Sequence, residues 1–308
     1  MRRLAIAAVL IGVCVTAACS SRAPAGPAAP TGTRARAPAT SDGRAGTART
    51  TRTPPHVTLS QVRMADGSIV TVAAFQGPVQ YVLHNGSQDP GPAYARFVRA
   101  GPAVSTAERP GLLAAFNGGF LMRSRAGGYE QEGHVFRALR HGLASLVIDG
   151  SGQARIGVWG VTLPVPGESV YSVRQNLWPL VLNGKRTPQT DKWWRWGGTV
   201  GHVEYVARSA VGQNAAGELM YAAGMATTPA DLARALAGHG ARIAMELDIN
   251  REWVQLDVAR TPGGALTGAI PDQVRPASQY ITGWTRDFVA VLAPAAGLRA
   301  GDASNPSS

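Results

Sequence analysis

The sequence predicts an α+β fold, with one domain built on a mixed, strand-rich sheet framework and a few packed helices. Three observations favour this class. Short apolar and β-branched runs bounded by glycines recur between residues 56 and 294, which is the pattern of strands. Two pairs of these runs are joined by glycine-containing turns, as in hairpins. One segment, Pro229–Ala237, carries the start and stop signals of a helix.

The expected strands share a short length, apolar residues that alternate or follow one another, and flanking turn residues. They are Ser68–Phe75, Val79–Leu83, Leu112–Phe116, Ala144–Ile148, Arg155–Trp159, Leu177–Leu182, Gly201–Ala207, Ile243–Asn250 and Phe288–Leu292. The expected hairpin turns are Asp149–Gly152 and Asn214–Gly217.

The expected helix follows Thr228, whose hydroxyl is suited to cap the first turn, and Pro229 fits the first helical position. Leu232, Ala235 and Leu236 give it one apolar face. Since the strand Ile243–Asn250 comes soon afterwards, we expect a helix-turn-strand unit packed on a largely β framework.

The first residues predict export. Arg2 and Arg3 precede an apolar run of 15 residues, Leu4–Ala18, which is shorter than the roughly 20 residues of a membrane-spanning helix. Residues 1–18 therefore have the layout of a secretory signal peptide. The segment Thr16–Cys19 resembles the lipobox of bacterial lipoproteins, whose cysteine is acylated. We expect a lipid on Cys19 and a location at the outer face of the cell membrane; the alternative is a plain signal peptide with an incidental cysteine.

The segments that flank the predicted domain, 56–294, have the composition of disordered chain. Residues 19–55 form an Ala-, Pro- and Arg-rich linker, and residues 295–308 form a tail. Eight of the 30 Lys and Arg residues lie between Arg2 and Arg52, so the chain from residue 56 onward carries only 22 − 18 = +4 of the net charge of +11. This distribution argues against a nucleic-acid partner. A basic linker fits anionic lipid headgroups or acidic wall polymers, unless it is simply solvated.

Cysteine usage and motifs exclude several kinds of site. Cys14 lies in the predicted signal peptide, so the mature chain has no disulfide. The sequence contains no phosphate loop, no Gly-x-Ser-x-Gly, no dinucleotide fingerprint and no recognised metal-ligand spacing. We therefore expect no metal and no cofactor, although Glu130, Glu132 and His134 could supply an acid, a base or a ligand.

Three segments, in this order, resemble the phosphodiester glycosidase family, whose best-known member removes an N-acetylglucosamine that covers mannose 6-phosphate. They are Ala114–Phe120 (AAFNGGF), Arg208–Gly224 (RSAVGQNAAGELMYAAG) and Pro229–Asp248. The resemblance implies a hydrolase that cleaves a sugar from a glycosyl phosphodiester in envelope or exported polysaccharide. The chain departs from the family where Glu246–Asn250 replaces Asn-Leu-Asp-Gly-Gly. A non-catalytic glycan or sugar-phosphate binding lipoprotein of the same fold therefore remains the alternative.

Two carboxylates are the candidate catalytic groups. Residues two apart on a strand share a face, so Glu246 and Asp248 would lie together with Cα atoms roughly 6.5 to 7 Å apart. One of them would act as acid or base at the glycosidic phosphodiester. The alternative is a solvated strand face, or a buried pair bonded to arginines.

The candidate substrate-binding residues come from the other two segments. The backbone amides at Asn117, Gly118 and Gly119 and the guanidinium of Arg208 would hold the substrate phosphate; a tight turn and a salt bridge are the alternatives. A nearby Gly-rich loop carries three tryptophans that either contact sugars or polyprenyl chains, or fill an edge of the core. They are Trp193, Trp194 and Trp196.

Overall fold

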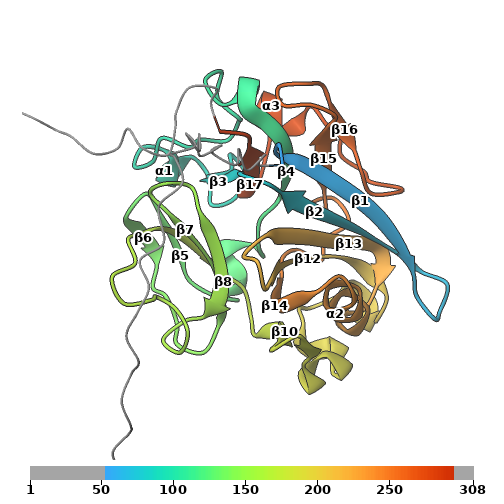
Figure 1. Cartoon of the computed structure of the whole chain (residues 1–308). Coiled ribbons are helices and arrows are strands. Elements are labelled where there is room, and N and C mark those ends of the chain that lie inside the picture. Colours follow the sequence, from blue (N-terminus) through green and yellow to red (C-terminus); the bar gives the residue numbers. More distant parts are fainter. Residues whose placement is uncertain (1–52, 295–308) are drawn as a thin grey trace, which may run out of the picture. The chain divides into compact units, whose positions relative to one another are not determined.

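Hairpins build most of the structure, in keeping with the glycine turns of the sequence. The computed structural model describes residues 53–294, whose strands form three sheets that pack together (Figure 1). Every pairing between the named strands of this part is antiparallel. The expectation of a mixed sheet is therefore wrong, and the domain has more β structure than an α+β class implies. Short turns, rather than helical crossovers, join many of the strands, which favours antiparallel pairing.

The largest sheet has seven strands in the order β1-β2-β13-β12-β14-β10-β11. Their bounds are β1 His56–Arg63, β2 Ile69–Gln76, β10 Pro179–Leu182, β11 Lys185–Arg186, β12 Val206–Asn214, β13 Leu219–Thr227 and β14 Ala241–Glu246. The predicted turn Asn214–Gly217 joins β12 to β13. The predicted strand Gly201–Ala207 is wrong over most of its length. Gly201 has a positive φ of 74° inside the short 3-10 helix η5 (Val200–His202), and the strand begins only at Val206.

Helix α2 (Pro229–Gly238) packs on this sheet, and it confirms the predicted helix. The Thr228 hydroxyl accepts a hydrogen bond of 3.1 Å from the Asp231 amide, which caps the first turn. Leu232 and Leu236 are fully buried among apolar residues of β2, β10, β12, β13 and β14. The helix therefore covers one face of the seven-stranded sheet.

The other two sheets have five strands each. The second has the order β16-β15-β4-β17-β3, and the third, on the left of Figure 1, has the order β6-β5-β9-β7-β8. Their bounds are β3 Gln80–His84, β4 Leu112–Asn117, β5 Tyr129–Gln131, β6 His134–Arg137, β7 Ala144–Asp149, β8 Ala154–Val158, β9 Val170–Gln175, β15 Leu256–Ala259, β16 Leu266–Gly268 and β17 Phe288–Leu292. The remaining helices are short: α1 Pro92–Ala95, α3 Gln279–Thr282, η1 Arg109–Gly111, η2 Met122–Ser124, η3 Pro188–Asp191 and η4 Trp193–Arg195.

One apolar cluster joins the three sheets. Phe116 of β4 stacks on Phe75 of β2 with ring centroids 5.6 Å apart, and it also contacts Tyr221 of β13 at 5.1 Å. Ala144 and Leu146 of β7 belong to the same cluster. The C-terminal ends of β4 and β14 are consequently held at the junction of the sheets.

Several predictions fall on residues 1–52 and 295–308, which lie outside the described part. They are the signal peptide, the lipidated Cys19, most of the linker and the tail. Within residues 53–294, no helix has the length and apolar character needed to cross a membrane.

Candidate functional site

Asp248 does not continue the strand that the sequence predicts. Strand β14 ends at Glu246. Leu247 then donates to the Ser209 carbonyl at 2.8 Å, while the Ser209 amide donates to the Asp248 carbonyl at 2.9 Å. Two residues of this segment therefore lie opposite one residue of β12, an irregularity that redirects the following side chains. Because the strand alternation is lost here, Glu246 and Asp248 point to different surroundings.

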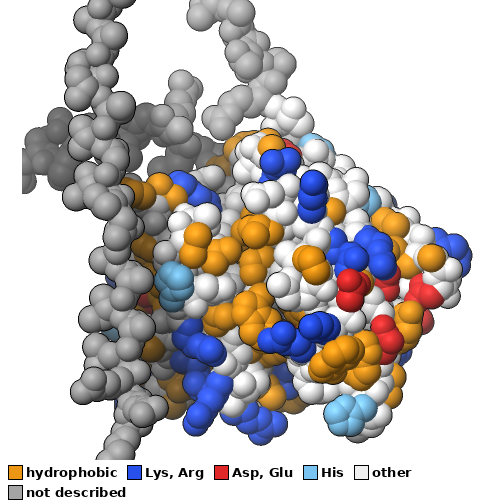
Figure 2. Space-filling model, turned by 90° about the horizontal axis from the view of Figure 1, so that it is seen from below, with side chains coloured by type: hydrophobic (Ala, Val, Ile, Leu, Met, Phe, Trp, Pro, Cys, Tyr) orange, Lys and Arg blue, Asp and Glu red, His pale blue; other side chains and the backbone are white. Residues whose placement is uncertain are grey.

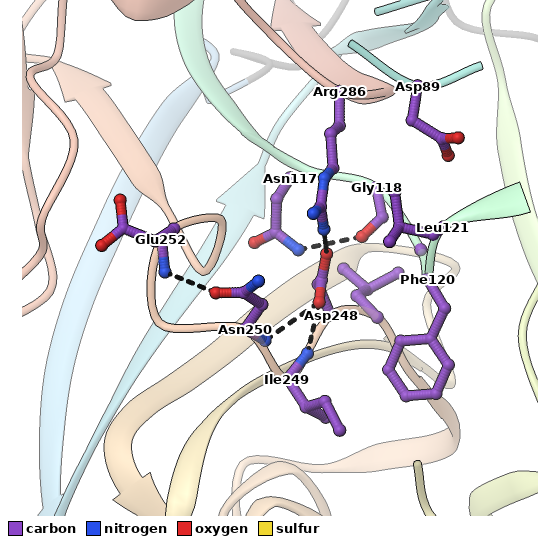
Figure 3. A network of polar contacts seen from close by, with 12 residues as sticks. Asp89, Asn117, Gly118, Phe120, Leu121, Asp248, Ile249, Asn250, Glu252 and Arg286 are labelled. Atoms are coloured by element: carbon purple, nitrogen blue, oxygen red, sulfur yellow. Dashed lines mark hydrogen bonds and ion pairs between the residues drawn. The ribbon is translucent and has the colours of Figure 1, made fainter. Parts of the chain in front are cut away.

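Asp248 lines a cavity of about 480 Å³. Its lining comes from the segment around η2, from η4 and the loop after it, and from residues 248–250. Figure 3 shows Phe120 and Leu121 beside Asp248 and Ile249. The lining residues include Phe120, Arg125, Trp194, Arg195, Gly198, Asp248, Ile249, Asn250 and Arg286. Three of the charged lining groups are arginines and one is a carboxylate, so the cavity is suited to an anionic ligand.

Three donors hold the Asp248 carboxylate in place, as Figure 3 shows. Its Oδ2 accepts from Arg286 Nη1 at 2.8 Å, and its Oδ1 accepts from the Ile249 and Asn250 amides at 2.7 and 3.0 Å. Burial raises the pKa of Asp248, while Arg286 and the two amides oppose that effect. A carboxylate offers about four acceptor positions, so one remains on Oδ2 for a water or a ligand.

Arg286 is the main site residue that the sequence reasoning missed. Its guanidinium lies 4.4 Å from the centroid of the Trp253 ring, a cation–π contact that fixes its orientation beside Asp248. The residue follows no motif and lies 38 positions from Asp248 in the chain. The signal that could have found it is the charged pair Arg286-Asp287 directly before the buried strand β17.

Asp89 is a second carboxylate that the sequence reasoning missed. An isolated backbone bridge pairs residue 89 with Arg286, and Asp89 Oδ2 accepts from the Met122 amide at 2.8 Å. Figure 3 places it on the Arg286 side of the network. Burial raises the pKa of Asp89, and the nearby charge of Asp287 acts in the same direction.

Asn117 lies beside this network but has no hydrogen-bonding capacity left for a substrate. Its Nδ2 donates to Gly118 O and Ser209 Oγ, each at 2.9 Å. Its Oδ1 accepts from the Tyr221 hydroxyl at 2.7 Å and from the Gln255 amide at 3.1 Å. An amide side chain makes about four such bonds, so Asn117 ties β4 to its neighbours.

The amides of Gly118 and Gly119 are also engaged within the protein. They donate to the carbonyl and to Oδ2 of Asp287, at 2.7 and 3.2 Å. Asp287 Oδ2 further accepts from Arg174 Nε at 2.7 Å, and both of these charged side chains are almost fully buried. The anion that meets the Asn-Gly-Gly segment is therefore an internal carboxylate, where the sequence predicted a phosphate.

Arg208 and Glu246 pair with each other, away from the cavity lining. Arg208 Nη1 lies 2.7 Å from Glu246 Oε1, and neither side chain has exposed surface. The register Ala210↔Glu246 places both in the middle of the seven-stranded sheet, and the Trp196 carbonyl accepts from Arg208 at 2.8 Å. Burial raises the pKa of Glu246 to about 7. Neither residue is among those that line the cavity.

The structure places the three tryptophans in different surroundings. Trp196 is fully buried and donates to the Gln189 carbonyl at 2.9 Å, so it fills the core. Trp194 is 58% exposed and lines the cavity, and Trp193 contacts it edge to face.

The group Glu130, Glu132 and His134 takes no part in the cavity. Glu132 accepts from the Arg99 and Ala100 amides at 2.8 and 2.7 Å, which ties down a loop. Within residues 53–294, no three His, Cys, Asp or Glu side chains are grouped so that they could hold a metal ion.

The fold and site define an antiparallel β domain with an arginine-lined cavity around one carboxylate. Among solved structures, the chain is similar to the catalytic domain of zebrafish N-acetylglucosamine-1-phosphodiester α-N-acetylglucosaminidase, auto-inhibited by its pro-peptide. The identity is 14%, over 78% of this chain and 82% of that chain, with a TM-score of 0.47. A hypothetical protein from Synechocystis is similar at 12% identity, over 77% and 62% of the two chains, with a TM-score of 0.41.

Both similarities are distant resemblances in structure, and neither assigns the chain to a family. No protein-family model matches the chain. No curated protein matches it either.

Proposed function

We propose that the chain is a hydrolase that cleaves a sugar from a glycosyl phosphodiester of envelope or exported polysaccharide. The observation that carries the proposal is the Asp248 carboxylate at the wall of a cavity whose other charged lining groups are Arg125, Arg195 and Arg286. A guanidinium suits a phosphate because its planar fork can donate two hydrogen bonds to it. The resemblance of the sequence to phosphodiester glycosidases points to the same substrate class.

The chemistry of this substrate explains how one carboxylate can be sufficient. Breaking the bond between the sugar C1 and the phosphate oxygen releases a phosphate monoester, whose second pKa is about 6. At neutral pH it departs as a dianion and needs no proton donor. Arginine side chains stabilise the charge that develops on it. An ordinary sugar ether, by contrast, needs a general acid.

Asp248 is then the general base. The acceptor position left on Oδ2 takes a proton from a water, whose oxygen forms the new bond to C1. The products are the free sugar, the phosphate monoester and one proton, which Asp248 passes to solvent. Arg286 acts on both groups, because it orients the carboxylate at 2.8 Å and also lines the cavity.

The test is turnover of the ethyl ester of N-acetylglucosamine 1-phosphate by the full chain, measured as released sugar. Asp248→Asn should lower kcat by at least about 100-fold with binding retained, because a positioned base is worth that much. Asp191→Asn is the matched control, since its side chain is 59% exposed on the surface. Methyl N-acetylglucosaminide should not be cleaved. Absence of turnover across several sugar phosphodiesters and pH values would end the hydrolase proposal.

A sugar-phosphate binding protein without turnover is the second candidate. The observation that favours it is that Asp248 is the one acidic side chain among the described lining residues, and it already pairs with Arg286. Calorimetric binding of the same ester without release of sugar identifies this case.

We further propose that the domain acts outside the cytoplasm, held at the outer face of the cell membrane by a lipid on Cys19. The support is the Thr16–Cys19 segment after an apolar run, together with a basic linker that suits an anionic surface.

A further inference from the structure

A second cavity adjoins the candidate site. It has a volume of about 420 Å³, and Gly198, Ile249 and Asn250 line both cavities. These three residues therefore form a shared wall, one side of which comes from the loop after η4 and the other from the loop after β14. The two cavities are therefore neighbours along these three residues.

The two cavities differ in chemistry. The second has the apolar lining residues Val203, Val206, Ala207, Met225 and Ile249, and Arg251 is its one charged lining residue; Gly198, Thr199 and Asn250 complete its lining. The first has three arginines and a carboxylate. A molecule that matches both has one anionic end and one apolar end.

The apolar cavity is open to solvent. Val203 is 47% exposed, and it lines the cavity together with the nearly fully buried Ala207. On the underside of the molecule, hydrophobic side chains lie directly beside Lys and Arg side chains (Figure 2). When a hydrocarbon group covers apolar surface that is exposed in a groove, the free energy falls in proportion to the apolar area removed from water.

We propose that the substrate is amphiphilic, a glycosyl phosphate ester of a lipid alcohol, with its sugar phosphate in the first cavity and its hydrocarbon chain in the second. The proposal rests on the proposed function, because the phosphate of the scissile diester is the point from which the chain extends. The occupant is inferred from the residues that the two cavities share. Ile249 lines both cavities, so an apolar group attached to an anion bound at Arg286 would pass it on the way to Val203 and Val206.

The test compares the ethyl and hexyl esters of N-acetylglucosamine 1-phosphate on the full chain, by calorimetry below micelle-forming concentrations. Each methylene that leaves water is worth about fourfold in affinity, the equivalent of ~0.8 kcal/mol. With half of the four added methylenes buried, the hexyl ester should bind at least about tenfold more tightly. Val203→Gln should reduce the hexyl-to-ethyl ratio to about threefold or less.

The control is Val135→Gln on β6, because Val135 is 59% exposed and lies outside both cavities. It should leave the ratio as in the unmodified chain. Equal affinity for the two esters overturns the inference, as does an equal effect of the two valine substitutions, while cleavage of the ethyl ester would still support the proposed function. If neither ester binds, both proposals fall.

Discussion

Gly118→Ala tests whether the Asn-Gly-Gly segment serves the fold or a ligand. A Cβ at Gly118 would lie 2.5 Å from Cγ of Asp287, whereas ordinary contact begins at 3.4 Å. Oδ2 of Asp287 would lie closer still, so Asp287 would have to move by more than about 0.9 Å, the difference at Cγ, and its 2.7 Å ion pair with Arg174 would break. Disrupting a buried ion pair costs about 3 to 5 kcal/mol. For a domain of this size, such a loss lowers the Tm by at least about 6 °C.

Thermal unfolding followed by circular dichroism measures this effect. Gly150→Ala is the matched control, because no atom lies within 4 Å of an added Cβ there and Gly150 has no positive φ. It should change the Tm by no more than about 2 °C. If Gly118→Ala leaves the Tm unchanged and instead weakens binding of the ethyl ester, the segment faces the ligand and the structural role inferred above is wrong.

Three further predictions concern charge and location. Burial raises the pKa of Glu246 from 4.5 to about 7, so between these pH values the folded chain retains a proton that the unfolded chain releases. The free energy of unfolding should therefore fall as the pH rises from 4.5 to about 7. Glu246→Gln should flatten this part of the Tm–pH curve. A slope that persists in the variant points to another group. Arg286→Lys should raise the KM for the ethyl ester about tenfold, since a lysine lacks the planar fork that binds a phosphate and stacks on Trp253; an unchanged KM would remove Arg286 from the binding site. Cys19→Ser should shift the protein from the membrane fraction to the soluble fraction, and unchanged fractionation and mass would exclude lipidation.

Local signals in the sequence predicted the elements whose boundaries depend on neighbouring residues. Phe288–Leu292 has the predicted bounds of its strand, and α2 differs from its prediction by one residue at its end. Both are set by contiguous apolar residues or by caps. Apart from the two predicted hairpins, the sequence did not predict which strands lie side by side. Strand β4 lies between β15 and β17, which come more than 100 positions later. Periodicity gives the face of each strand but does not say which strand lies beside it.

The site was predictable only where it depends on residues close together in the sequence. Asp248 was found because it lies in the predicted strand Ile243–Asn250, in a segment that resembles a known family, and the structure places it at the cavity. Its proposed partner Glu246 was placed beside it by strict alternation, which the irregular pairing at Ser209 interrupts. Arg286 reaches Asp248 only through the tertiary fold, so no spacing rule could have connected them.

The manner in which Asp248 is held affects how such a protein can diversify. Two of its three donors are the backbone amides of Ile249 and Asn250, and every residue except proline supplies that group. The side chains that follow the carboxylate can therefore be exchanged while the carboxylate keeps its anchor. Residues 249 and 250 line both cavities, so under the proposed function natural variation or a combinatorial library at these two positions would alter the choice of aglycone while Asp248 keeps its place.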